Sequence, residues 1–459
     1  MLNHRRNLFR LASIICIASI GMPGLKSFAS PPGSLNVPVV YYKLKNGLKV
    51  VLSQDKTAPT IAVGVYYNIG FRIEPKNRTG FAHLFEHMMF QGSKNLGKME
   101  FVQLVQKNGG VLNGSTRFDF TNYYEVMPSN KLETALWAEA DRMKGLSITQ
   151  ANLTNQQGVV KNEVKVNVLN QPYGGFPWLD MPQYANENWY NAHNFYGDLA
   201  DLDSAKLEDV DSFFKTYYAP NNAVIVVIGD FEVNDAKKWV DQYFAAIPSA
   251  TIPPKPDITE PKQEKEKRAV KEDKLANKPA IAIAYKMPEK NTPEYFAMGL
   301  IDQMLIEGND SKLYQALVQD KGYTSSVGGG INYLGNMFDY NGPMVFMSNL
   351  IYDSTVKPES IIEEYDKAVA QLDHVTQTDL NLALVKMRSD LYDQLGGGFG
   401  IGKLSILASF ALFYDNPAMI NTVEDSFKKV TPELIRKTAK EYLRSTNRTI
   451  LIVDPKGKK

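Results

Sequence analysis

Three side chains with metal-binding and acid–base chemistry, His83, Glu86 and His87, lie close together in the segment FAHLFEHMMFQG, residues 81–92. If this segment is a helix, positions four apart share one face, so the two imidazoles can point at a single ion. Glu86 follows His83 by three residues and leans toward the same place. Imidazoles bind Zn²⁺, and a nearby carboxylate can act as a general base. The pattern favours a metal site over a pair of hydrogen-bonded core histidines.

A catalytic zinc site with an open position needs a third protein ligand, which we expect to be a carboxylate from a second helix. Glu163 is the candidate, because it lies 76 residues after His87 in the segment GVVKNEVKVN, which has helical periodicity. Alone, Glu163 would be more typical of a solvated helix carboxylate. Together with His83 and His87 it completes a predicted ligand set for one Zn²⁺ per chain.

The elements that must position these residues occur twice. Residues 81–92 align without gaps with AMGLIDQMLIEG, residues 297–308. At the three polar positions the second copy has Gly299, Asp302 and Gln303, whereas the apolar positions are kept. The alignment predicts duplicated domains in which only the first copy holds the metal.

The fold class predicted from the periodicities is α+β. Strand-like alternation, as at residues 60–67, is mixed with helical periodicity, as at residues 132–146. We therefore expect two homologous domains, each an antiparallel sheet packed with helices, joined by a charged linker. Prolines and charges of both signs predict that linker at residues 252–275. The predicted parts are a signal peptide (1–29), an N-terminal metal-binding domain (30–251), the linker, and a C-terminal homologous domain without the motif (276–459).

The N-terminus is typical of a secretory signal peptide. Three arginines precede an apolar run at residues 11–22, and Ser27, Phe28 and Ala29 suit cleavage after Ala29. A retained N-terminal anchor is the alternative. Cleavage would remove Cys16, the only cysteine of the chain, so the mature protein would have neither a disulfide nor a thiol nucleophile. A signal peptide without a cysteine framework favours a periplasmic location.

Charge and hydropathy exclude two classes of partner. The chain of 459 residues has 51 Lys and Arg against 50 Asp and Glu, so no excess of positive charge predicts nucleic-acid binding. After the signal peptide no run approaches the ~20 apolar residues of a membrane span. We therefore expect no transmembrane segment after signal cleavage.

The motif TGFAHLFEHMMFQGSKN, with its His-x-x-Glu-His order, resembles that of the pitrilysin/insulinase zinc metallopeptidases. The resemblance covers nearly the whole mature chain, including GGVLNGSTRFDFTNYY at residues 109–124. Within the family, the chain resembles the half-size bacterial members and the mitochondrial processing peptidase subunits. The family's third zinc ligand is a Glu at the spacing of Glu163, and Glu86 takes the place of its general base. The resemblance implies a secreted zinc metalloendopeptidase that hydrolyses oligopeptides or unfolded segments. Glu86 would take a proton from water and return it to the leaving nitrogen.

Substrate contacts follow from the same resemblance. Val111, Leu112 and Asn113 resemble the family's edge strand beside the metal, to which an extended peptide can add by main-chain hydrogen bonds. Asn113 would then hold the peptide; the alternative is an ordinary turn-forming Asn before Gly114. Seven residues before Glu163, the family often has a second Glu. This chain has Gln156 there, a residue beside the ligand set that can form a hydrogen bond but carries no charge, which predicts weaker zinc binding or slower turnover.

One departure from the family predicts a partner. Full-length members carry an Arg and a Tyr, seven residues apart, in a later domain that closes over the substrate; here Val318 and Ser325 occupy those places. We therefore expect a heterodimer in which a homologous subunit supplies the Arg and the Tyr. A nearby tyrosine (Tyr323, Tyr333 or Tyr340) is the alternative source. His193 is expected to be structural. Two other functions stay open: a non-catalytic assembly subunit of the same fold, and a dedicated processing protease.

Overall fold

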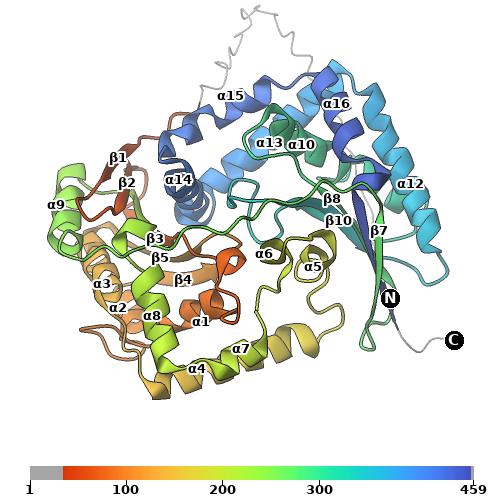
Figure 1. Cartoon of the computed structure of the whole chain (residues 1–459). Coiled ribbons are helices and arrows are strands. Elements are labelled where there is room, and N and C mark those ends of the chain that lie inside the picture. The colour runs from red at the N-terminus through yellow and green to blue at the C-terminus, as the bar shows by residue number, and fades with distance from the viewer. Residues whose placement is uncertain (1–34, 456–459) are drawn as a thin grey trace, which may run out of the picture. The chain divides into compact units, whose positions relative to one another are not determined.

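The computed structural model describes residues 35–455, so the predicted signal peptide lies outside the described residues. These residues form two sheets, with strand orders β1-β2-β6-β3-β5-β4 and β7-β11-β8-β10-β9 (Figure 1). The strands are β1 (Val40–Lys43), β2 (Lys49–Gln54), β3 (Thr60–Tyr67), β4 (Val111–Thr116), β5 (Thr121–Pro128), β6 (Ala223–Gly229), β7 (Lys267–Glu272), β8 (Ala280–Lys286), β9 (Gly328–Ile331), β10 (Val345–Ile351) and β11 (Arg448–Asp454).

The two sheets repeat one topology. In the first, β2 pairs in parallel with β6, and β6, β3, β5 and β4 then pair antiparallel. In the second, β7 pairs in parallel with β11, and β11, β8, β10 and β9 pair antiparallel in the same way. The expected α+β class is confirmed, and each sheet is largely but not wholly antiparallel. The parallel pair arises because the last strand of each half returns after a long helical connection, which parallel pairing requires.

Helices cover both faces of the two sheets. They are α1 (Phe81–Met88), α2 (Glu100–Lys107), α3 (Leu132–Lys144), α4 (Gln150–Val164), α5 (Met181–Ala185), α6 (Trp189–Ala192), α7 (Leu199–Ser204), α8 (Leu207–Tyr217), α9 (Val233–Phe244), α10 (Pro293–Leu305), α11 (Lys312–Tyr314), α12 (Pro358–Ala370), α13 (Gln377–Gly396), α14 (Ile401–Tyr414), α15 (Val423–Lys428) and α16 (Pro432–Tyr442). One face of the first sheet shares a buried core with α1, α3, α8 and α9. α1 follows β3 as α10 follows β8, so the aligned segments occupy equivalent places in the two halves.

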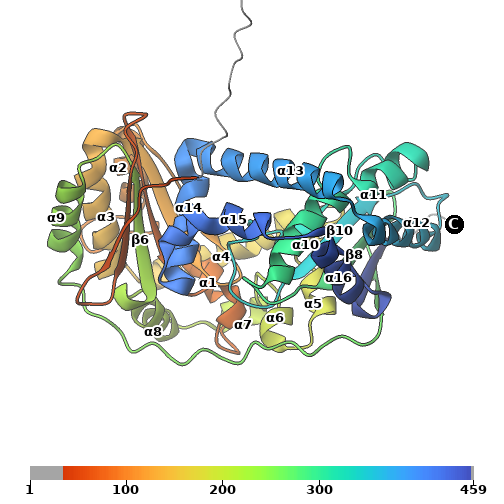
Figure 2. The ribbon, with the colours of Figure 1, turned by 90° about the horizontal axis from the view of Figure 1, so that it is seen from above.

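Each half also lends a helix to the other half's sheet. α14, from late in the chain, packs on β2, β3 and β6 (Figure 2). Gly64 on β3 permits this close approach, because a Cβ there would meet Leu404 of α14 at 2.6 Å. In return α5 packs on β7, β8 and β11. The domain boundaries at residues 251 and 276 therefore stay a prediction, since each sheet is covered in part by a helix from the other half of the chain.

Part of the predicted linker is a strand. Residues 267–272 form β7 at the edge of the second sheet, which contradicts an exposed connector over the whole of 252–275. The charges do not prevent pairing, because alternate side chains of an edge strand can reach acidic partners. Lys267 pairs with Glu187 at 3.1 Å and Lys271 with Asp180 at 2.7 Å. The preceding proline-rich stretch has no helix or strand.

Within residues 35–455, no single helix combines the length and the apolar composition needed to cross a membrane. The bent pair α13 and α14 meets the length and composition criteria jointly, with a 68° bend between its helices, and most of α14 is buried inside the protein.

Candidate metal centre

The helix α1 has an apolar face against the first sheet and a polar face that carries the histidines. It begins after Gly80, whose left-handed φ of 82° ends the preceding turn. Phe81, Leu84, Phe85 and Met88 recur at helical spacing and are buried, which fixes the rotation of the helix on the first sheet. That rotation places the imidazoles of the two histidines on the opposite stripe, pointing away from this apolar core.

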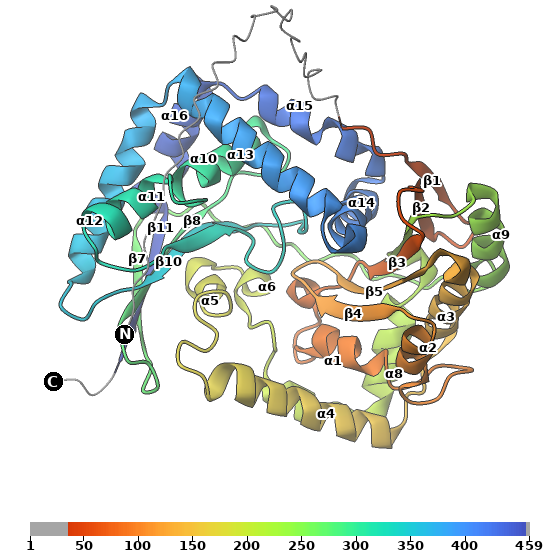
Figure 3. The ribbon, with the colours of Figure 1, turned by 180° about the vertical axis from the view of Figure 1, so that it is seen from behind.

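The helix α4 brings the third predicted ligand. Thr149 caps its N-terminus by accepting a hydrogen bond from the backbone N–H of Asn152, and Leu153, Val160 and Val164 bury one side. α4 packs directly against α1, and Figure 3 shows the two helices together below the first sheet. Glu163 lies one residue before the end of α4 and faces α1.

The ligand atoms of His83, His87 and Glu163 come together at distances suited to one metal ion. Nε2 of His87 lies 3.3 Å from Nε2 of His83. Oε1 of Glu163 lies 3.5 Å from Nε2 of His83, and Oε2 lies 3.2 Å from Nε2 of His87. Tetrahedral zinc with bonds of about 2.0–2.2 Å needs neighbouring ligand atoms about 3.3–3.6 Å apart. The residues therefore fit zinc, and among the described residues this is the one cluster of three such groups close enough to share an ion.

The electrostatics of the cluster favour an ionised carboxylate. Hydrogen bonds from His83 and then from His87 lower the pKa of Glu163 well below its usual range, although partial burial opposes them. The hydroxyl of Tyr196 donates a hydrogen bond to Oε1 of Glu163 at 3.3 Å, and burial raises the pKa of Tyr196 to about 12. Tyr196 therefore remains a hydrogen-bond donor that orients the carboxylate.

Glu86 is oriented by β4. The hydroxyl of Thr116 donates a hydrogen bond to Oε2 of Glu86 at 2.8 Å. This hydrogen bond engages one of the two carboxylate oxygens, and the other is Oε1. Gly114 lets the strand come this close, because a Cβ at that position would lie 3.3 Å from Cγ of Glu86. Sequence reasoning missed both Thr116 and Tyr196. The one available signal was the period of two, which puts residues 114 and 116 on the same face of a strand.

The predicted substrate-binding residues lie on a free edge. β4 is the last strand of the first sheet, and Val111 is 57% exposed. Leu112 packs against the core, whereas Asn113 is exposed on the face opposite Thr116 and accepts a hydrogen bond from the backbone N–H of Gly114 at 2.9 Å. Peptide binding by Val111, Leu112 and Asn113 stays a prediction.

The other residues singled out from the sequence lie apart from the cluster or at its margin. Gln156 is buried on α4, and the side-chain hydrogen bond found for it in the described chain runs to Asn155 rather than to a predicted ligand. Val318 is half-buried and Ser325 exposed. Tyr340 is buried in the core, where its hydroxyl cannot reach a substrate.

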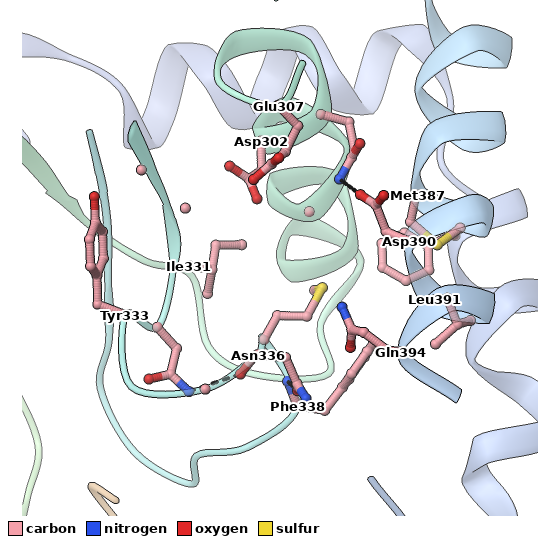
Figure 4. Close-up of a pocket in the computed structure, with 18 residues that line it drawn as sticks. Asp302, Glu307, Ile331, Tyr333, Asn336, Phe338, Met387, Asp390, Leu391 and Gln394 are labelled. Atoms are coloured by element: carbon pink, nitrogen blue, oxygen red, sulfur yellow. Dashed lines mark hydrogen bonds between the residues drawn. The ribbon is translucent and has the colours of Figure 1, made fainter. Parts of the chain in front are cut away.

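The second copy forms a pocket instead of a ligand cluster. A cavity of about 330 Å³ lies beside α10, lined by Gly299, Asp302 and Gln303 at the positions aligned with His83, Glu86 and His87. Figure 4 shows Asp302 and Glu307 at one end and Asp390 across from them. Among the described residues that line this cavity there is no histidine, so the second copy lacks the metal-binding side chains of the first, as the alignment predicted.

Comparisons with known proteins match both halves to related families. The family model described as insulinase (peptidase family M16) matches residues 49–188, and that described as peptidase M16 inactive domain matches residues 204–384. The zinc protease PqqE of Helicobacter pylori is 26% identical over 419 residues, which cover 90% of this chain and 92% of that protein. The mitochondrial-processing peptidase subunit beta of Rattus norvegicus is 27% identical over 202 residues, 44% of this chain and 41% of that protein.

Solved structures share the fold over most of the chain. A protease from Helicobacter pylori superposes with a TM-score of 0.83 at 25% identity, covering 92% of this chain and all of that chain. A peptidase M16 inactive domain from Pseudomonas fluorescens superposes with a TM-score of 0.79 at 18% identity, covering 92% of this chain and 98% of that chain. The second likeness concerns the fold alone.

Proposed function

Because the chain belongs to the insulinase family of peptidases, M16, we propose that it is a zinc metalloendopeptidase that hydrolyses oligopeptides or unfolded segments. The observation that carries the proposal is the closeness of three side chains: Nε2 of His83 and Nε2 of His87 lie 3.3 Å apart, and each lies 3.2 to 3.5 Å from one of the two carboxylate oxygens of Glu163. Named zinc proteases among the relatives support it. A periplasmic location rests on the N-terminal sequence.

The chemistry is divided between the ion and the side chains. A zinc ion held by His83, His87 and Glu163 would supply Lewis-acid chemistry, acidifying water and polarising the peptide carbonyl. Glu86, held by Thr116 through Oε2, would take a proton from the attacking water at Oε1 and deliver it to the leaving nitrogen. The free edge of β4 would align the extended peptide by main-chain hydrogen bonds.

The first test uses a partner subunit. Val318 has no side-chain hydrogen-bond donor, and Ser325 has neither the charge of an Arg nor the acidity of a Tyr hydroxyl. Neither residue can polarise a carbonyl as an Arg and a Tyr can, so the purified chain alone should cleave peptides slowly. Co-expression with a homologous chain that carries the Arg and the Tyr should raise kcat/KM by about 100-fold, the usual effect of an oxyanion donor. A chelator should abolish the activity and zinc should restore it. Full activity of the isolated chain would exclude the proposed heterodimer, and a protein without zinc or cleavage in either form would indicate a non-catalytic subunit.

Thr116 provides a second prediction. Thr116→Val keeps the shape of the side chain but removes the hydrogen bond to Oε2 of Glu86. We expect kcat to fall by about 10-fold, within the range for lost partners of active-site groups, with zinc affinity unchanged. Thr121→Val is the matched control, because the Thr121 hydroxyl is equally buried but donates to the carbonyl of Ile69. Equal kcat values for the two variants would show that Thr116 does not orient the base.

A further inference from the structure

A buried carboxylate from outside α1 caps the helix that carries the metal-ligand candidates. Glu74 is fully buried, Oε2 accepts a hydrogen bond from the backbone N–H of Gly80 at 2.8 Å, and Oε1 accepts one from Ala82 at 2.5 Å. Gly80 itself offers no side-chain cap. A negative charge at this end of a helix is favourable, because the free N–H groups there carry partial positive charge.

The cap lies next to the first ligand. α1 has only eight residues, and His83 is the third of them, one residue after the capped N–H of Ala82. A change in the first turn would therefore move Nε2 of His83 directly. Small displacements of the metal-binding atoms would weaken the site, because their three spacings match the ligand spacings around one tetrahedral ion.

His193 lies next to Glu74, and both of its ring nitrogens point at carbonyl oxygens. Nε2 is 2.6 Å from the carbonyl of Phe71, and Nδ1 is 3.1 Å from the carbonyl of Trp189. Carbonyl oxygens only accept hydrogen bonds, so both contacts are satisfied only if each nitrogen carries a hydrogen. The two contacts therefore favour a ring that carries a hydrogen on both nitrogens, and this ring lies 3.8 Å from Oε2 of Glu74 and stacks on Trp189 at 4.4 Å between ring centres.

The surrounding charges leave Glu74 as the direct counter-ion. Lys76 lies on the ring of Trp189, at 5.3 Å from its centre, and is open to solvent. Asp201 accepts hydrogen bonds from the backbone and hydroxyl of Thr79, and Asp198 caps α7. Arg72 is engaged by Asp119 at 2.8 Å. Burial raises the pKa of Glu74, whereas His193 and the two capping N–H groups lower it.

We propose that Glu74, with His193 as its buried imidazolium counter-ion, positions the first turn of α1 and so fixes the metal-ligand geometry. This inference rests on the proposed zinc site. Both are positioning residues, since neither touches the ion or the substrate.

The test measures zinc affinity of the full chain by competition with a chelating dye. Glu74→Gln keeps the shape but turns an N–H donor toward one of the two capped N–H groups. We expect zinc binding to weaken by about 10- to 100-fold, as for other lost outer-shell partners. The control Asp339→Asn also alters a buried carboxylate, one held by Ser405 and Ser409 away from α1, and should leave zinc affinity unchanged.

A double variant separates positioning from folding. Glu74→Gln/His193→Gln has no unpaired buried charge, so it should regain thermal stability relative to Glu74→Gln while its zinc affinity stays low. Recovery of both would show that the pair serves only folding. Wild-type zinc affinity in folded Glu74→Gln would overturn the proposal, whereas absence of zinc binding in the wild type would overturn the proposed function instead.

The protonation of His193 has its own readout. In the zinc-loaded protein labelled with ¹⁵N-histidine, which has five histidines in all, the resonances lost in His193→Gln identify this ring. At neutral pH both of its nitrogens should have the chemical shifts of protonated imidazole. A neutral ring with one bare nitrogen would contradict the counter-ion role.

Discussion

Replacing Glu86 by Gln should nearly abolish peptide hydrolysis while the protein still binds zinc. The expected loss in kcat is about 10³-fold, within the range for removal of a general base. The amide can still accept the hydrogen bond that Thr116 donates to Oε2, so the side chain should keep its place. It cannot take a proton from water, and this is the one function that the substitution removes.

The measurement is steady-state hydrolysis of a fluorogenic peptide with the partner subunit present, alongside zinc content by elemental analysis. Asp302→Asn is the matched control, because Asp302 holds the aligned position on α10 and lies away from α1. We expect normal turnover in the control and stoichiometric zinc in both variants. Persistent turnover in Glu86→Gln would show that Glu86 is not the general base. Loss of zinc in this variant would show that Glu86 contributes to the structure of the metal site.

The relative placement of the two histidines could be predicted because helix periodicity alone fixes it. His83 and His87 are one turn apart, so a helix is enough to bring them together. Glu163 was predicted from a family spacing, and its place on α4 beside α1 agrees with the third position of a ligand set. The repeat likewise predicted that α10 keeps the apolar pattern of α1 without its ligands.

What the sequence could not predict depends on contacts between distant segments. Thr116 and Tyr196 approach the cluster from a strand and a loop whose positions are set by the packing of whole elements. α14 is rich in apolar residues, which indicates burial but does not indicate that it packs on the first sheet. The strand β7 is charged and forms only because β11 offers a parallel edge.

Replacing Glu163 by Gln should cost far more zinc affinity than any change outside the ligand set. The carboxylate faces both imidazoles, at 3.5 and 3.2 Å, and its low pKa keeps it charged at neutral pH. An amide has no charge and can offer only one oxygen. We therefore expect zinc binding to weaken by more than the ~10- to 100-fold typical of outer-shell partners.

Thermal unfolding makes this loss visible without any activity assay. Zinc at about 100 times its Kd should stabilise the wild type by about 2.7 kcal/mol, because the ion binds only the folded chain. Glu163→Gln should show almost no zinc-dependent shift. Asp203→Asn is the control, since it also removes a carboxylate beside α4, one that pairs with Lys161 at 2.6 Å without reaching the imidazoles. If both variants keep the full shift, the third ligand is not Glu163, and two histidines alone would not give the three protein ligands that a catalytic zinc ion requires.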